Sequence, residues 1–112
     1  MPELKKYKMF IDGEWVDSES KKTFETLNPE NNEPWAVVPE ASANDVDRAV
    51  KAAQKAFEGE WPKLLPRDRA KFLRAIADQL RKNAEMLGEI ETIDTGKLFR
   101  ETKQQANYCR IL

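Results

Sequence analysis

The sequence predicts a mixed α/β chain in which short β-hairpins come first and three to four helices follow. Two observations support this: turn-forming residues divide the first third into short strand-like runs, and the apolar residues change to helical spacing after about residue 40. The expected organisation is a flexible N-terminus over residues 1–6, a β-hairpin region over 7–39 and a helical region over 40–112. A chain of 112 residues holds one domain at most.

The hairpin region contains two candidate strand pairs. In MFIDGEWV, Met9–Ile11 and Glu14–Val16 flank an Asp-Gly pair, which tolerates the positive φ of a tight turn. KTFETL and PWAVVP form a second hairpin or an extended pair around NPENNE, where Pro29 presets its φ and the asparagines tolerate the left-handed conformation. Pro39 lacks a backbone donor and is expected to end the last strand.

Several start and stop signals define the expected helices. Ser42 and Asp45 have the spacing of a capping box, and a helix is predicted over residues 43–57. Pro66 is expected to open a second helix, and a third restarts near Asn83 and stops at Gly96. The last segment, LFRETKQQANYCRIL, has helical composition and no stop signal, so the helical region is expected to be incomplete at its C-terminus. The stripe expected to be buried on the second helix consists of Ala70, Leu73, Ile76, Ala77 and Leu80.

Charge and composition exclude several classes of partner. The 19 basic and 20 acidic residues are interspersed and leave a net charge of −1, so no basic field attracts nucleic acid or an anionic membrane. No run approaches the roughly 18 apolar residues of a membrane span, and the first residues lack the apolar core of a secretory signal. A cytoplasmic location is therefore expected, and the single cysteine fits a reducing compartment.

Catalytic groups are mostly absent. The chain has no histidine, which removes the usual general base and histidine-based metal sites. Cys109 has no clear activating partner, because the adjacent Arg110 points in a different direction on a helix, so a core or interface cysteine is favoured over a reactive one. The acids at Glu85, Glu89 and Glu91 are best interpreted as a solvated helix face.

The stretch IDTGK at the end of the third predicted helix contains an acid that needs an explanation. A phosphate-binding loop requires several glycines before a helix, whereas Gly96 follows one, so this interpretation fails. A glycine C-cap with Lys97 near the negative end of the helix dipole explains those two residues. It leaves Asp94 in the last turn, where the dipole opposes an acid unless a cation or a donor offsets it.

Five segments in series resemble the N-terminal portion of the aldehyde dehydrogenase superfamily. They are MFIDGEWV, FETLNPENNE, DVDRAVKAAQKAF, FLRAIADQLRKN and ETIDTGK, in that order and spacing, and the resemblance covers about residues 8–112. Members of that family are several times longer. The resemblance implies that these strands and helices form the outer part of a Rossmann-like cofactor-binding domain. It also implies an enzyme that oxidises an aldehyde to a carboxylic acid with NAD or NADP through a cysteine thioester.

The resemblance assigns no catalytic or cofactor-binding residue to this chain. The family's nucleophilic cysteine, glutamate base, asparagine and cofactor loop all correspond to positions beyond residue 112, and Cys109 falls elsewhere in the pattern. The resemblance does imply a monovalent-cation site for K⁺ or Na⁺, with backbone carbonyls of Thr26 and Leu27 and the carboxylate of Asp94. Hard oxygen ligands suit such an ion, and its charge would offset the placement of Asp94. The alternative is a solvated or capping acid.

Two functions are therefore expected as alternatives. The first is the N-terminal part of an NAD(P)-dependent aldehyde dehydrogenase, structural and inactive alone, whose partners are the rest of that chain and further copies in a homo-oligomer. The second is a free-standing α+β interaction module that presents its C-terminal helix to a partner.

Overall fold

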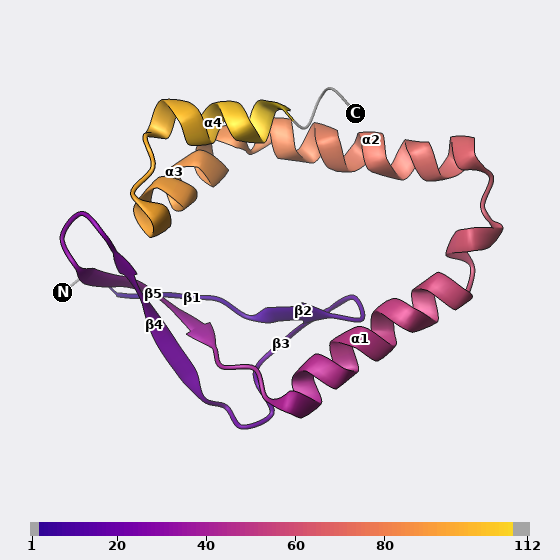
Figure 1. Cartoon of the computed structure of the whole chain (residues 1–112), viewed down its shortest axis with the longest axis horizontal. Coiled ribbons are helices and arrows are strands. Elements are labelled where there is room, and N and C mark those ends of the chain that lie inside the picture. Colours follow the sequence, from indigo (N-terminus) through magenta and orange to yellow (C-terminus); the bar gives the residue numbers. More distant parts are fainter. Residues whose placement is uncertain (1–2, 109–112) are drawn as a thin grey trace. The chain divides into compact units, whose positions relative to one another are not determined.

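The computed structural model describes residues 3–108, and the chain forms two compact units. The first unit contains the residues up to 27 together with 34–64, and the second contains 28–33 and the residues from 65 onward. Strands come first and four α-helices follow (Figure 1), so the mixed α/β fold class predicted from the sequence is confirmed. No helix among the described residues is long and apolar enough to cross a membrane.

The first predicted hairpin is confirmed. Strands β2 (Met9–Ile11) and β3 (Glu14–Val16) pair antiparallel, with Ile11 opposite Glu14. The two turn residues between them, Asp12 and Gly13, have φ of 51° and 80°, the left-handed conformation that the Asp-Gly pair tolerates.

The second predicted strand pair belongs to a three-stranded sheet. Strands β4 (Thr23–Asn28) and β5 (Glu33–Pro39) are neighbours in this sheet, whose order is β1-β5-β4. Strand β1 (Lys5–Lys6) runs parallel to β5, with Lys5 opposite Ala36. The flexible N-terminus expected over residues 1–6 misses this strand, because two lysines carry no strand signal and the free edge of β5 decides the pairing.

Helix α1 (Ala43–Glu58) begins at the predicted capping box. The Asp45 N–H donates to Ser42 Oγ at 3.2 Å, and the Ser42 N–H donates to Asp45 Oδ2 at 2.8 Å. Both orphan donors are thus satisfied within the first turn. The helix ends before Gly59, and a short 3₁₀ helix, η1 (Trp61–Lys63), follows it.

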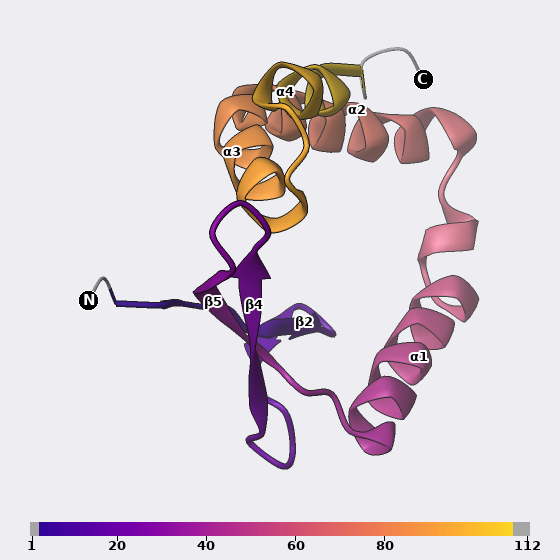
Figure 2. The ribbon, with the colours of Figure 1, turned by 60° about the vertical axis from the view of Figure 1, so that its left-hand side comes forward.

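Three helices make up most of the second unit, and their limits agree with the predicted signals. Helix α2 (Pro66–Lys82) has proline at its first position, α3 (Ala84–Thr95) restarts after Asn83, and α4 (Phe99–Tyr108) is the predicted fourth helix. Gly96 ends α3 with φ 73°. Helices α3 and α4 lie side by side, as two views agree (Figures 1 and 2).

A glycine and a threonine set the close contact between α3 and α4. A Cβ built on Gly88 would lie 2.9 Å from the backbone nitrogen of Lys103, so only glycine allows the two helices to approach this closely. Thr102 is fully buried at the same point, and its hydroxyl donates to the Gly88 carbonyl at 2.9 Å. The Thr92 hydroxyl lies 3.0 Å from that of Thr102, so the buried hydroxyl is well satisfied.

The predicted burial of the α2 stripe is wrong in this structure. Leu73 and Ile76 are 62% and 56% exposed, and Ala36 and Ala84 are the buried hydrophobic residues within the described range. Helical spacing identifies an apolar face but not the surface that covers it. Of the apolar residues expected at the chain end, Tyr108 is 64% exposed, whereas Cys109 and the residues after it lie outside the described range.

Candidate functional site

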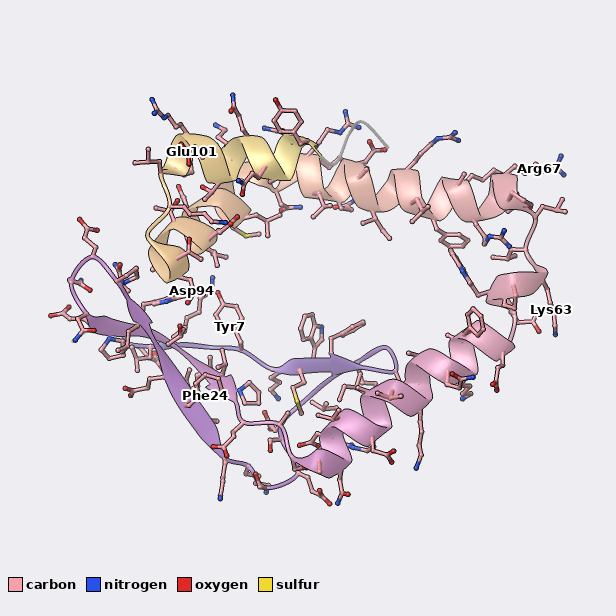
Figure 3. All side chains as sticks on the ribbon, viewed as in Figure 1. Tyr7, Phe24, Lys63, Arg67, Asp94 and Glu101 are labelled. Carbon is pink, nitrogen blue, oxygen red and sulfur yellow. The ribbon has the colours of Figure 1, made fainter. Side chains whose placement is uncertain are left out.

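The last turn of α3 carries Asp94, the acid that the sequence singles out. Asp94 is exposed and lies two residues before the left-handed Gly96, whose N–H donates to the Thr92 carbonyl at 2.9 Å. Figure 3 shows Asp94 at this end of the helix. Its carboxylate therefore lies where the helix dipole is negative, as the sequence predicts.

The predicted helix cap at this end is confirmed. Lys97 Nζ donates to Glu91 Oε1 at 2.7 Å, and the Thr95 hydroxyl donates to the Glu91 carbonyl at 2.6 Å. The Lys97 ammonium is thus held by a carboxylate of the same helix, although both side chains remain partly exposed.

The turn after β4 packs against the same helix end. A Cβ built on Gly96 would lie 3.0 Å from Pro29 Cγ, so Gly96 is required both by its positive φ and by this close approach. The Asn32 N–H donates to the Asn28 carbonyl at 2.7 Å and closes the turn. The second unit therefore joins the turn that follows β4 to the end of α3.

The three predicted cation ligands belong to different parts of the chain. Thr26 and Leu27 lie on β4, in the first unit, and Asp94 lies on α3, in the second. Within residues 3–108, no group of three or more histidine, cysteine, aspartate or glutamate side chains is arranged to hold a metal ion. That finding concerns side-chain ligands, whereas the predicted site takes two of its three ligands from backbone carbonyls. The set Thr26, Leu27 and Asp94 therefore stays a prediction.

The carboxylate of Asp45 has more partners than the capping box requires. Its side chain is fully buried and accepts hydrogen bonds from the Glu19 N–H at 3.2 and 3.3 Å, and Arg48 Nη2 lies 2.5 Å from Oδ1. These bonds lower the pKa of Asp45 well below its ordinary value, chiefly through the Ser42 N–H, while burial acts in the opposite direction.

The Glu19 carboxylate strengthens the same connection. It accepts hydrogen bonds from the Ser42 hydroxyl at 3.2 Å and from the Asn44 amide at 3.0 Å. The loop between β3 and β4 is thereby attached to the start of α1. Sequence reasoning missed this connection, because Glu19 lies 26 residues from Asp45 and no local pattern indicates the contact.

The comparison with protein families identifies the chain. Residues 15–111 match the model of the aldehyde dehydrogenase family. The chain belongs to this family. The resemblance predicted from five short segments is therefore confirmed over nearly the whole length of the chain.

Relatives and solved structures agree with this assignment. An aldehyde dehydrogenase of Aspergillus niger is 49% identical over 89 residues, which are 80% of this chain and 18% of that protein. The crystal structure of an NAD-dependent aldehyde dehydrogenase from Sinorhizobium meliloti matches with a TM-score of 0.90 and 34% identity, over 95% of this chain and 22% of that one. Betaine aldehyde dehydrogenase from Staphylococcus aureus in complex with NAD⁺ matches with a TM-score of 0.85 and 42% identity, over 89% of this chain and 20% of that one.

This chain spans about a fifth of the length of these relatives. Its described part resembles solved aldehyde dehydrogenases in fold as well as in sequence.

Proposed function

We propose that this chain is the N-terminal portion of an NAD(P)-dependent aldehyde dehydrogenase that oxidises an aldehyde to a carboxylic acid. The observation that carries the proposal is the family match over residues 15–111 together with the 22% share that the chain covers of an NAD-dependent aldehyde dehydrogenase. The cofactor is NAD or NADP, bound outside this segment. The parent enzyme is a cytoplasmic homo-oligomer.

The segment has a structural role within that enzyme. Its described residues expose large apolar side chains on α1 and α2, including Val50, Phe57 and Leu73, which are 60%, 70% and 62% exposed. Covering such side chains stabilises a fold by roughly 1.5 to 3 kcal/mol for each large one fully buried. The rest of the aldehyde dehydrogenase chain is the partner that supplies this cover.

The proposal includes a monovalent cation, K⁺ or Na⁺, held by the carbonyls of Thr26 and Leu27 and by the carboxylate of Asp94. Two observations support it: Asp94 lies at the negative end of α3, and Pro29, just after β4, packs on the Gly96 that ends this helix. A cation at this place would offset the unfavourable position of the carboxylate.

Enzyme assays of two proteins test the activity. The purified 112-residue chain should not reduce NAD⁺ or NADP⁺ with any aldehyde, because the thioester chemistry needs an activated thiolate, a base and a cofactor site. A longer product that begins with this segment should show that activity and should keep it after Cys109→Ser, since Cys109 is not the nucleophile. Turnover by the short chain, or its absence in the longer product, contradicts the proposal.

The exposed apolar residues also fit a second function, a free-standing interaction module derived from the same segment. The intact mass of the protein purified from its source separates the two functions. A mass several times that of this 13.0 kDa chain supports the enzyme, and a mass equal to it supports the module.

A further inference from the structure

A groove lies between the β2–β3 hairpin and α1, entirely within the first unit. Its volume is about 380 Å³, within the lower range of pockets that hold small molecules. The hairpin contributes Ile11, Glu14 and Val16, which the antiparallel register places on one face of the two strands. The opposite face of the hairpin carries Phe10 and Trp15, whose ring centroids lie 4.9 Å apart.

The helix side of the groove is basic. Arg48, Lys51 and Lys55 line it, and spacings of three and four residues place them on one face of α1. Ala52 lies on the same face and, with Ile11 and Val16 of the hairpin, contributes apolar side chains to the lining. The groove therefore combines a basic wall on α1 with apolar side chains.

The hairpin side of the groove is acidic, with Glu14 on β3 and Asp12 in the turn. The two walls do not neutralise each other. Arg48 pairs with Asp45 at 2.5 Å and Lys51 with Asp47 at 2.6 Å, both partners lying on α1 itself. Among the ion pairs of the described chain, none involves Lys55, Asp12 or Glu14. Opposite charges thus face the groove from its two sides.

We propose that this groove binds a small zwitterion with a short aliphatic body, an ω-amino acid or a molecule of that shape. The ammonium group lies at Glu14 and Asp12, the carboxylate lies at Lys55, and the methylene groups rest on Ile11, Val16 and Ala52. A simple anion is repelled by the acidic wall and a simple cation by the basic wall, so only a ligand with both charges matches the whole groove.

Titration calorimetry of the 112-residue chain at low ionic strength, with three matched probes, tests whether the ligand needs both charges. 5-Aminopentanoate carries both groups, whereas pentanoate and pentylammonium each carry one. The zwitterion should bind at least about tenfold more tightly than either single-charge probe, the difference expected from one additional charged contact. Equal binding of pentanoate and 5-aminopentanoate would show a simple anion site and overturn the proposal, as would the absence of heat from all three. 4-Aminobutanoate and 6-aminohexanoate then give the preferred spacing of the two charges.

Single substitutions locate the binding in the groove. Glu14→Gln and Lys55→Met keep the shape of their side chains and should each weaken 5-aminopentanoate binding about tenfold. Glu14→Gln should leave pentanoate binding unchanged or stronger, because it removes only the acidic wall. Lys82→Met, at the end of α2, removes a lysine outside the groove and serves as the control. If all three variants bind 5-aminopentanoate as tightly as one another, the ligand does not bind in the groove and the assignment is contradicted. No aldehyde or NAD enters these measurements, so their result is independent of the proposed enzyme function.

Discussion

A single buried side chain, Asp45, connects the β3–β4 loop to α1, and its pKa gives a test by pH. Because the pKa of the folded state is lowered, the carboxylate stabilises the fold above the unfolded pKa of about 3.9 and loses this effect as the pH falls below it. Asp45→Asn should lower the melting temperature most above about pH 5, and its difference from the wild type should shrink as the pH falls toward about 2. Circular dichroism melting at several pH values measures this difference.

Asp47→Asn is the matched control for Asp45. The Asp47 carboxylate is 57% exposed and pairs with Lys51 on the surface, where an ion pair contributes little to stability. Its melting curve should follow that of the wild type at every pH. A difference between Asp45→Asn and the wild type that does not change with pH would show that the negative charge of Asp45 does not stabilise the fold, and that the loss comes from replacing an acceptor oxygen by an amide donor.

Asp94 gives a second test at the scale of a residue, within the longer enzyme that we propose. If Thr26, Leu27 and Asp94 hold a monovalent cation, Asp94→Ala should abolish any K⁺ or Na⁺ dependence of thermal stability while leaving the chemical step largely intact. At about 100 times its Kd, the ion would stabilise the fold by roughly 2.7 kcal/mol. Melting in potassium, sodium and a bulky organic cation at one ionic strength keeps screening constant.

Asp78→Ala removes another exposed helical carboxylate, on α2, and should leave the cation dependence of the enzyme as it is. If the wild-type enzyme melts at the same temperature in all three salts, Asp94 is a solvated helix-end acid.

At the scale of elements, the contact between α3 and α4 depends on Gly88. Gly88→Ala improves the helix propensity by about 1 kcal/mol, but its Cβ would lie 2.9 Å from the Lys103 backbone nitrogen, which has no flexible end that can move aside. Overpacking of this kind typically costs about 1 to 3 kcal/mol, so the variant should be less stable overall. Urea unfolding of the chain measures the loss.

Glu89→Ala is the control for Gly88, because it changes the next residue of α3 at an exposed position. Its effect should stay within about 0.5 kcal/mol. An unchanged or increased stability of Gly88→Ala would mean that the two helices separate easily and that Thr102 does not fix their distance.

Local signals in the sequence predict the elements of this fold well. The Asp-Gly turn, the Ser42 capping box, Pro66 and Gly96 each act through the backbone of a few neighbouring residues, and the structure confirms all four. A signal that acts within one turn of the chain can be recognised without knowledge of the rest of the fold.

Long-range contacts are the part that the sequence does not predict. Strand β1 forms because β5 offers an edge, and Asp45 reaches Glu19 across 26 residues, so neither leaves a local pattern. Gly88 is similar, because the residues around it do not distinguish it from any other glycine in a helix. Only the position of α4 shows why a glycine is required there. In the candidate cation site, the sequence identifies the acid at the helix end, whereas the contact of Pro29 with Gly96 emerges only from the fold.

At the scale of the whole molecule, the exposed apolar residues decide how this chain behaves alone and within the proposed enzyme. Phe57, on the last turn of α1, is 70% exposed, so Phe57→Ala in the 112-residue chain should change the free energy of unfolding by less than about 1 kcal/mol. In the longer enzyme, where we propose that the rest of the chain covers α1, the same change should cost roughly 3 to 5 kcal/mol.

Denaturant unfolding of both proteins measures this contrast, with Glu58→Ala as the control at the neighbouring exposed position. The control should have a small effect in both proteins, because a glutamate at the helix end has little apolar surface to bury. A loss below about 1 kcal/mol for Phe57→Ala in the longer enzyme would place the ring at its surface. The apolar face of α1 would then stay exposed in the enzyme as well. The rest of the enzyme would have to pack on α2 and the hairpins instead.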